Sequence, residues 1–271
     1  MKVGIVGAGN MGSKYIKKFD SMGLDAIIID IEIDKLKHVP GKFKKYTNLD
    51  HALEEENIDY LFVATDPQSH IPIAKKALER GINVLIEKPP SIKASELESA
   101  IDFAEKKGVV LSVSEIELRS NSVRNLEVRF PITDVEAYRL NLGRGYINPF
   151  FDLAWHDLYI MNYLFGDFKL KKVKDKGDIF EIYGETDNSD FFLQVAWGHE
   201  FLRREWIMKG KEGNITLNFA EDKIIYHDGN VKEKDNIDKL ELMISQFLNN
   251  PSFESSYRAL NILKEFEKFS S

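Results

Sequence analysis

Three side chains in this sequence are of types that together could take a proton from a hydroxyl group. Lys88 follows Glu87 at the end of an apolar run, residues 82–86. Asp152 and His156 are four positions apart, so on a helix both side chains lie on one face. Oxidation of an alcohol needs a group that takes the hydroxyl proton while hydride leaves the carbon. A lysine, a histidine and a carboxylate beside a hydride acceptor would suit that reaction.

The start of the sequence predicts the site of such an acceptor. An apolar run, residues 2–6, is followed by an amphipathic segment at 13–20 and by a second apolar run at 26–29, which ends at Asp30. Between the first run and the amphipathic segment lies a G-x-G-x-x-G motif, which consists of Gly7, Ala8, Gly9, Asn10, Met11 and Gly12. Strand, glycine turn, helix, strand and acid in this order predict a dinucleotide-binding βαβ unit.

Each part of this unit has a physical reason. Gly7 permits a tight turn, Gly9 lets the backbone approach a pyrophosphate, and Gly12 lets the helix lie close to the strand. The N–H groups and the dipole at the start of the helix favour phosphate. Asp30 would accept hydrogen bonds from ribose hydroxyls and repel a 2′-phosphate, which predicts NAD rather than NADP. A run of lysines between residues 35 and 45 could instead hold a 2′-phosphate. A solvent-exposed connecting segment, that is a solvated connection, explains the run better.

The remainder of the first part alternates apolar runs with amphipathic segments. Further strands are predicted at residues 60–64, 82–86 and 109–113, and helices at 49–56, 71–79 and 95–107. The chain is therefore expected to be an α/β protein with an N-terminal Rossmann domain, residues 1–118, built on a doubly wound parallel sheet. A polar loop follows one of these strands, at the edge where open α/β sheets bind ligands; it contains Thr65, Asp66, Pro67 and His70.

After residue 118 the pattern changes to short alternating segments with turn signals between them. This pattern predicts a C-terminal α+β domain, residues 119–271, with a largely antiparallel open sheet. One helix at 151–165 is expected to carry Asp152 and His156. Two closing helices are predicted at 238–248 and 255–269, and five lysines between 169 and 176 predict an exposed strand edge.

The composition describes an ordinary globular protein, with 43% hydrophobic and 30% charged residues. The net charge of −7 argues against nucleic acid as a partner. No apolar run approaches the ~20 residues of a membrane span, and the first residues predict a core strand rather than a signal peptide. The absence of cysteine excludes disulfides and cysteine metal sites. We expect a cytoplasmic protein with no membrane partner and no metal site.

With these motifs in this order, the sequence resembles the Gfo/Idh/MocA family of sugar oxidoreductases over essentially its whole length. The matching segments are residues 7–12, 65–67 with His70, 87–89, and 152–157 before 163–166. The resemblance implies an NAD-dependent oxidoreductase that acts on a CH–OH group of a sugar, polyol or nucleotide-sugar. It also implies a homodimer or homotetramer that associates through the open face of the second sheet.

The resemblance also implies residue roles. Lys88 would hydrogen-bond the reacting hydroxyl and help its proton leave, and His156 would be the principal acid/base. Asp152 would bind a neighbouring hydroxyl or orient the site. A cis bond before Pro89, common in this family, would aim Lys88. The cofactor site would combine the glycine motif and Asp30 with Thr65, Asp66, Pro67, His70, Glu87 and Lys88.

The chain departs from the family pattern at two places. Tyr159 stands where many members have a second aspartate after the histidine, and we expect it to bind substrate without taking a proton. The segment 114–124 is similar, with several changes, to a motif of members acting on nucleotide-linked sugars, such as UDP-N-acetylglucosamine 3-dehydrogenase-like proteins. Arg144 would meet an anionic substrate or form a surface ion pair.

Three alternatives stay open. One is a relative that retains NAD for transient oxidation, as glycosidase-like members do. Another is a reductase of imines or linear tetrapyrroles. The third is a non-catalytic NAD-binding regulator, which the departure at Tyr159 would favour.

Overall fold

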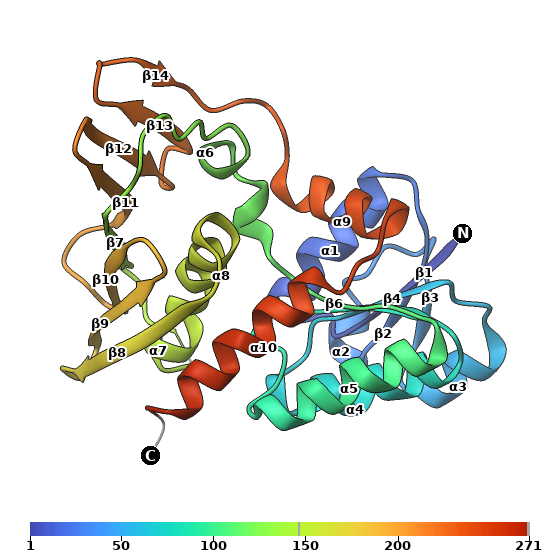
Figure 1. Cartoon of the computed structure of the whole chain (residues 1–271). Coiled ribbons are helices and arrows are strands. Elements are labelled where there is room, and N and C mark those ends of the chain that lie inside the picture. Colours follow the sequence, from blue (N-terminus) through green and yellow to red (C-terminus); the bar gives the residue numbers. More distant parts are fainter. Residues whose placement is uncertain (146, 270–271) are drawn as a thin grey trace. The chain divides into compact units, whose positions relative to one another are not determined.

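The computed structural model describes residues 1–145 and 147–269 (Figure 1). The chain divides into two compact units. The first contains residues 1–114 and 240–263, and the second contains residues 115–239 with the chain from 264 onward. The domain boundary expected at residue 118 stays a prediction; the units differ from it mainly in the segment 240–263, which packs with the first unit. Within the described ranges, no helix is long and apolar enough to cross a membrane.

The first unit is built on a parallel sheet of six strands. The strands are β1 (Lys2–Val6), β2 (Asp25–Ile29), β3 (Lys44–Tyr46), β4 (Tyr60–Val63), β5 (Asn83–Ile86) and β6 (Leu111–Val113). Their order is β3-β2-β1-β4-β5-β6, and every neighbouring pair is parallel. The strand order reverses between β1 and β4, so the ligand-binding edge is expected at their carboxyl ends. The predicted Rossmann sheet is confirmed.

Helices pack on this sheet (Figure 1). The first five of them connect its strands, and the last two come from the end of the chain. The helices are α1 (Asn10–Ser21), α2 (Ile33–Leu36), α3 (Leu49–Glu55), α4 (Pro67–Glu79), α5 (Ala94–Lys107), α9 (Lys239–Asn249) and α10 (Glu254–Glu267). Local chemistry sets several of their ends. Asp66 caps α4 by accepting a hydrogen bond from the Gln68 N–H at 3.1 Å. Gly108 ends α5 in the left-handed conformation, with φ of 69°.

The segment 240–263 completes the core of the first unit. The Phe247 ring lies 5.4 Å from Phe62 and 5.5 Å from Tyr60, measured between ring centroids. The edge strand β6 is held by two serines of α10: the Ser255 hydroxyl accepts from the Val113 N–H at 2.9 Å, and the Ser256 hydroxyl donates to the Leu111 carbonyl at 2.6 Å. These serines therefore satisfy backbone groups that an edge strand would otherwise expose.

The second unit is built on an eight-stranded sheet. The strands are β7 (Asp134–Leu140), β8 (Phe168–Asp175), β9 (Ile179–Thr186), β10 (Asp190–Ala196), β11 (Arg203–Gly210), β12 (Gly213–Asn218), β13 (Lys223–Tyr226) and β14 (Val231–Lys232). Their order is β14-β13-β12-β11-β7-β10-β9-β8, and only the pair β7–β10 is parallel. The largely antiparallel sheet is confirmed, and the lysine-rich β8 is one of its edges, as predicted.

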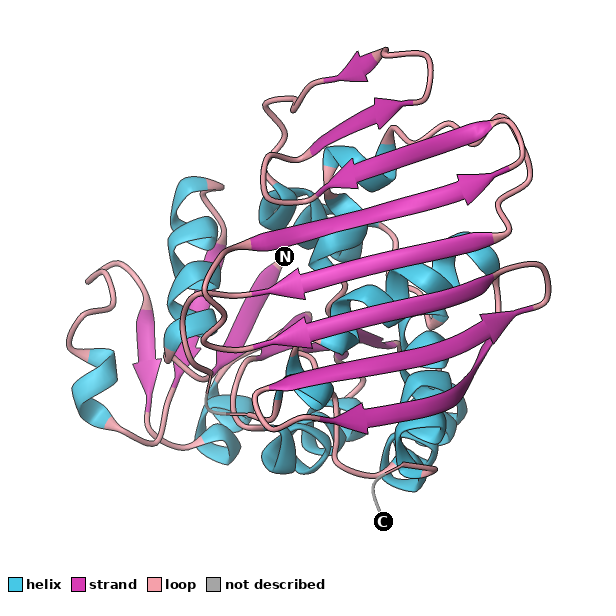
Figure 2. Ribbon diagram, turned by 90° about the vertical axis from the view of Figure 1, so that its left-hand side faces the viewer, coloured by secondary structure: helices cyan, strands magenta, loops and turns pink. Residues whose placement is uncertain are grey.

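One face of this sheet is open, as Figure 2 shows. On the other face lie η1 (Ile116–Arg119), α6 (Asn121–Arg124), α7 (Pro149–Asp152) and α8 (Ala154–Phe165). The single helix predicted at 151–165 is thus two helices. Asn148 caps α7 by accepting from the Phe150 N–H at 2.8 Å, and Pro149 takes the first helical position. Leu153 separates α7 from α8 but keeps right-handed helical angles.

Candidate functional site

The glycine turn at the end of β1 has the geometry that the motif predicts. Gly7 has a φ of 98°, and its N–H donates to the Ile29 carbonyl of β2 at 2.8 Å. A Cβ at Gly12 would lie 1.9 Å from the Gly7 carbonyl oxygen, so only glycine fits there. A Cβ at Gly9 would meet nothing within 4 Å in the described part of the chain. The turn is therefore closely packed behind and open at Gly9.

The start of α1 fits a phosphate. Gly9 is the N-cap residue, and none of the described side chains caps the first turn of the helix. No acidic residue lies in that turn either, while Asn10 is exposed and Met11 is half-buried. Backbone N–H groups and the helix dipole thus remain available to an anion, which is the arrangement that binds a pyrophosphate.

Asp30 lies at the end of β2, next to this turn. Its Oδ2 accepts a hydrogen bond from the Ala8 N–H at 2.7 Å, and its Oδ1 accepts from the Glu32 N–H at 2.9 Å. The residue is buried. An ionised carboxylate has about four acceptor positions, so two remain for ribose hydroxyls. Asp30 can therefore hold the turn and bind a ribose at the same time.

The lysines that follow Asp30 are engaged elsewhere. Lys35 and Lys37 each pair with an acid three residues earlier at 2.6 Å. Lys42 pairs with Asp20, Lys44 with Glu56, and Lys45 donates to the Val39 carbonyl. These contacts favour the solvated-connection interpretation of the run over a 2′-phosphate site.

The loop after β4 is organised by a buried histidine. His70 is 1% exposed, its Nδ1 lies 3.0 Å from the Pro89 carbonyl oxygen, and its Nε2 lies 3.0 Å from the Thr65 carbonyl oxygen. Burial lowers the pKa of His70, against the opposing effects of the two carbonyls and of Glu87 and Asp66. His70 therefore joins the loop after β4 to the segment after β5. Its two nitrogens contact backbone, so it shapes the predicted cofactor loop from behind.

Thr65, Asp66 and Pro67 form the first residues of that loop. The Ser69 hydroxyl donates to Thr65 Oγ1 at 2.7 Å and to Asp66 Oδ2 at 3.0 Å. Asp66 caps α4 and Pro67 is its first residue. These three positions thus fix the path of the chain from the end of β4 into α4.

The segment after β5 brings a buried carboxylate next to Lys88. Glu87 Oε1 accepts from the Tyr15 hydroxyl of α1 at 2.6 Å, and Oε2 accepts from the Lys88 N–H at 3.2 Å. Lys88 is half-buried, and the Lys88–Pro89 bond is cis, as the family resemblance implied. Glu87 links α1, which begins at the glycine turn, to the backbone that carries Lys88.

The second unit holds the other predicted catalytic side chains. Asp152 is the last residue of α7 and His156 lies in the first turn of α8, and both are half-buried. The His156 N–H donates to the Leu153 carbonyl at 3.2 Å, so the chain keeps a helical turn between the two residues. Lys88 belongs to the first unit, whereas Asp152 and His156 belong to the second.

Tyr159 lies behind His156 rather than at an open surface. Its side chain is 0% exposed, and its hydroxyl lies 3.1 Å from His156 Nδ1. The same hydroxyl accepts a hydrogen bond from the Glu117 N–H of η1 at 2.9 Å. This position differs from the direct substrate contact expected for Tyr159, because both polar contacts of the hydroxyl are within the protein.

A buried ion pair fixes the neighbouring residue. Arg139 of β7 donates to Asp157 through Nε at 2.6 Å and through Nη2 at 3.2 Å, and Trp206 Nε1 donates to Asp157 Oδ1 at 2.8 Å. Burial would lower the pKa of Arg139, but attraction to Asp157 and their hydrogen bonds raise it above its ordinary value. Asp157 therefore points toward the sheet and anchors α8 to it.

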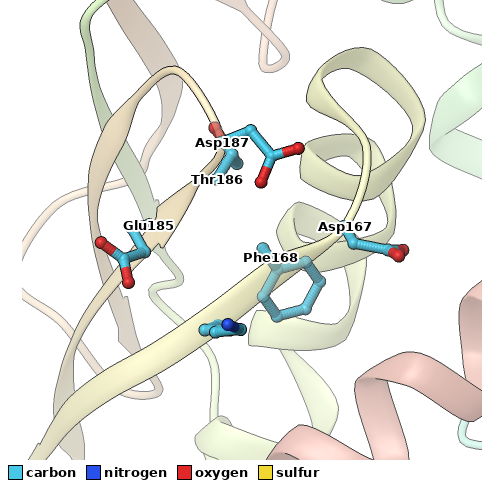
Figure 3. A pocket seen from close by; sticks show the side chains of 6 residues that line it. Asp167, Phe168, Glu185, Thr186 and Asp187 are labelled. Atoms are coloured by element: carbon cyan, nitrogen blue, oxygen red, sulfur yellow. The ribbon is translucent and has the colours of Figure 1, made fainter.

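Arg144 is exposed on the loop between β7 and α7. A pocket of about 110 Å³ lies elsewhere in the second unit, at the edge formed by β8 and β9 (Figure 3). It is lined by Asp167, Phe168, Lys169, Glu185, Thr186 and Asp187, none of which is a predicted site residue. Among the residues that the structure describes, no group of three or more His, Asp or Glu side chains could hold a metal ion.

Comparisons with known proteins agree with this geometry. Residues 1–115 match a family described as "Oxidoreductase family, NAD-binding Rossmann fold", GFO_IDH_MocA. UDP-N-acetylglucosamine 3-dehydrogenase from Acidithiobacillus ferrooxidans is 24% identical over 119 residues, which cover 43% of this chain and 37% of that protein. Inositol 2-dehydrogenase from Corynebacterium glutamicum is 31% identical over 115 residues, which cover 38% of this chain and 34% of that protein. The chain thus spans about a third of the length of these curated relatives.

The fold likeness extends further than the sequence likeness. The solved structure of UDP-N-acetylglucosamine 3-dehydrogenase GnnA from Acidithiobacillus ferrooxidans superposes with a TM-score of 0.88 at 20% identity. The superposition covers 99% of this chain and 96% of that chain. At this identity the likeness concerns the fold, and it includes the second unit as well as the Rossmann sheet.

Several contacts that support the site had no signal in the sequence. Tyr15 and Glu87 are 72 positions apart, and Glu117 and Tyr159 are 42 apart, so only tertiary packing brings them together. One signal was available: the pair Asn148-Pro149 has the residue types of an N-cap and a first helical position. It would have placed the start of α7 two residues before the predicted helix.

Proposed function

Residues 1–115 carry the NAD-binding Rossmann domain of the Gfo/Idh/MocA oxidoreductase family, and from this premise we propose a function for the chain. The protein is a nicotinamide-dependent dehydrogenase that acts on a CH–OH group of a sugar, polyol or nucleotide-sugar. Support for this substrate class comes from the relatives, which are named for UDP-N-acetylglucosamine and inositol.

The cofactor of the proposal is NAD rather than NADP. The residues that would hold it are the glycine turn, the start of α1 and Asp30. The single observation that carries the proposal is the carboxylate of Asp30, held at the turn by the Ala8 N–H at 2.7 Å. A negative charge fixed there favours ribose hydroxyls and repels a 2′-phosphate. The acidic partners of Lys35 and Lys37 leave those lysines less able to offset that repulsion.

Lys88, Asp152 and His156 are the proposed catalytic residues. The bound nicotinamide would accept hydride from the substrate carbon. The protein must then hold the hydroxyl oxygen and take its proton, a task suited to the Lys88 amine and the His156 imidazole. Asp152, one turn before His156, would bind a neighbouring hydroxyl. Arg144 is retained as a contact for an anionic substrate group.

The test is a dehydrogenase assay with matched cofactors. The purified protein is incubated with NAD or NADP and with aldoses, inositols or UDP-sugars, and formation of the reduced nicotinamide is followed by absorbance. Turnover with NAD on at least one CH–OH substrate, and its loss in Lys88→Ala, is the expected result. Tight NAD binding without turnover on any of these compounds would contradict the proposal and favour a regulator. Release of a sugar without net NADH would favour the glycosidase-like alternative.

The proposal includes association of identical subunits. One face of the second sheet is open (Figure 2). Three half-buried aromatic residues of its strands lie together, with the Tyr138 and Tyr183 rings 6.0 and 5.2 Å from the Phe192 ring between centroids. We propose a homodimer or homotetramer formed through this face, which light scattering on the purified chain would test. The cytoplasmic location stays a prediction from the sequence.

A further inference from the structure

We infer that Tyr159 fixes the tautomer of His156, so that the neutral imidazole carries its proton on Nε2. On the proposed function, His156 then donates a hydrogen bond to the substrate oxygen and does not take its proton. Tyr159 is a positioning residue in this scheme, because it acts on the substrate only through His156.

The Tyr159 hydroxyl group is enclosed by the protein. Tyr159 is 0% exposed, so its hydroxyl is shielded from bulk solvent. The hydroxyl accepts a hydrogen bond from the Glu117 N–H at 2.9 Å and lies 3.1 Å from His156 Nδ1. The two rings are 5.7 Å apart between centroids, at an angle of 74°. Within the described ranges, no other hydrogen-bond partner of this hydroxyl is found.

These contacts decide where the phenolic proton goes. A tyrosine hydroxyl has one proton to donate, and the backbone N–H of Glu117 cannot accept it. His156 Nδ1 is the remaining partner, so the hydroxyl donates to Nδ1. A neutral imidazole that accepts at Nδ1 carries its proton on Nε2.

Burial and two nearby carboxylates keep Tyr159 protonated. The carboxylates belong to Glu117 and Glu115, whereas the positive charge of Arg139 acts in the opposite direction. Burial raises the pKa of Tyr159 well above its ordinary value, and the negative charge of Glu117 adds to this effect. The phenol therefore remains a donor across the working pH range. Conversion of Tyr159 to a phenolate that could accept a proton from the imidazole is excluded by the same surroundings.

Protonation of His156 conflicts with this arrangement. An imidazolium carries protons on both nitrogens, so Nδ1 would point a proton at a hydroxyl that already accepts from Glu117. The tyrosine proton would then have no acceptor in a buried position, which costs free energy. A carboxylate in place of Tyr159 would have the opposite effect, because it would accept from Nδ1 and stabilise the imidazolium. Tyr159 therefore favours the neutral form of His156.

The contact between Tyr159 and His156 is fixed by residues on both sides of it. Asp157 follows His156 directly and is anchored by Arg139 and by Trp206. Glu117 is itself held, since its carboxylate pairs with Lys239 at 3.0 Å. The turn of α8 that carries His156 and Tyr159 is thus fixed on both sides.

In alcohol oxidation, the hydrogen-bond donor and the base are then two different residues. The Nε2–H group of His156 donates to the substrate oxygen. As the O–H bond of the substrate breaks, a base other than His156 Nε2 must take the proton and form a new bond to it. Lys88 is the amine available for this step in the proposed function, whereas His156 polarises and orients the oxygen.

Nitrogen NMR of the free protein tests the tautomer directly. The protein is labelled with ¹⁵N in histidine, and the His156 signals are assigned by their loss in His156→Gln. An unprotonated Nδ1 and a protonated Nε2 near neutral pH are expected. Tyr159→Phe keeps the ring but removes the donor, so the share of the Nδ1–H form should rise. Tyr163→Phe, on the exposed part of the same helix, is the control and should leave the tautomer unchanged. A His156 protonated on Nδ1 in the unaltered protein would overturn the inference.

A pair of substitutions tests the role in turnover. The side-chain amide nitrogen of glutamine reaches about as far as Nε2, whereas that of asparagine reaches only to Nδ1. If His156 acts as a donor through Nε2, His156→Gln should keep kcat within ~10-fold, and His156→Asn should lose much more. If His156 is the base, both should lose roughly 10²–10⁴-fold, which would contradict the donor role. The NMR result needs no turnover, so failure of the dehydrogenase proposal and failure of this inference are separable.

Discussion

The backbone N–H of Ala8 donates to Oδ2 of Asp30 at 2.7 Å, so the acid that ends β2 also holds the glycine turn that ends β1. The two halves of the cofactor motif, eighteen residues apart from Gly12 to Asp30, are joined by a hydrogen bond within the protein itself. Pre-organisation of this kind lowers the cost of ordering a binding loop. One carboxylate thus serves both the shape and the charge of the cofactor site.

Asp30→Asn should weaken the preference for NAD over NADP. The amide oxygen can still accept from Ala8, so the turn should persist, while the charge that repels a 2′-phosphate is lost. The ratio of the NADP and NAD dissociation constants should fall by the equivalent of roughly 1–3 kcal/mol. Calorimetric titration with both cofactors measures it. Asp34→Asn, an exposed acid paired with Lys37, is the control. An unchanged ratio in Asp30→Asn would show that another group sets cofactor choice.

Lys88→Ala should separate cofactor binding from chemistry. NAD affinity should stay within a few fold, because the glycine turn and Asp30 provide the expected contacts. Turnover should fall by roughly 10²–10⁴-fold, the usual contribution of a positioned proton-transfer group. Steady-state kinetics with NAD titration measures both quantities, and Lys93→Ala, an exposed lysine nearby, serves as control. Unchanged turnover in Lys88→Ala would show that Lys88 takes no proton in the reaction.

Local patterns in the sequence were sufficient for much of the first unit. The glycine motif predicts a turn because its requirements are local, and Gly7 and Gly12 have the predicted geometry. Strand runs and helix ends follow from composition over a few residues, as at Gly108. The cis bond before Pro89 came from the family resemblance and not from a local pattern.

The remainder depends on contacts that no local pattern encodes. The position of Phe247 against Phe62 follows from tertiary packing, and so does the hydrogen bond from Glu117 to Tyr159. Tyr159 shows the difference well. Its residue type suggested a substrate contact, but a buried hydroxyl needs internal partners, and the fold provides them. A sequence can mark a departure from a pattern without indicating which atom the new side chain will contact.

His70 should make the stability of the first unit pH-dependent. Burial lowers its pKa in the folded state, so the unfolded chain binds a proton more readily. Its contribution is therefore complete above the unfolded histidine pKa of ~6.5 and is lost as pH falls through the folded value. Urea unfolding at a series of pH values between neutrality and mild acid should show a decline of at most ~1.4 kcal/mol per pH unit from this group.

The variant His70→Gln isolates the contribution of His70 to the pH dependence of stability. It should unfold at lower urea concentration at neutral pH, because one of the two backbone contacts is lost or lengthened. Its stability should also fall less steeply than that of the unaltered protein toward acid. His38→Gln, an exposed histidine in the same unit, should leave both the midpoint and the slope unchanged. An identical pH slope in His70→Gln and the unaltered protein would show that His70 does not titrate on unfolding.

Removal of one partner from the Arg139–Asp157 pair should strongly destabilise the second unit. The two side chains are 4% and 1% exposed, so Asp157→Asn leaves a buried guanidinium without its counter-charge. The expected loss is about 3–5 kcal/mol in the free energy of unfolding, measured in urea at constant slope. The double variant Arg139→Met with Asp157→Leu should lose less than the sum of the two single variants, since no charge is left unpaired. The exposed pair Lys171–Glu185 is the matched control, and Lys171→Met should cost less than about 1 kcal/mol. If Asp157→Asn behaved like this surface control, the pair would not anchor α8, and the fixed geometry assigned to His156 and Tyr159 would need another cause.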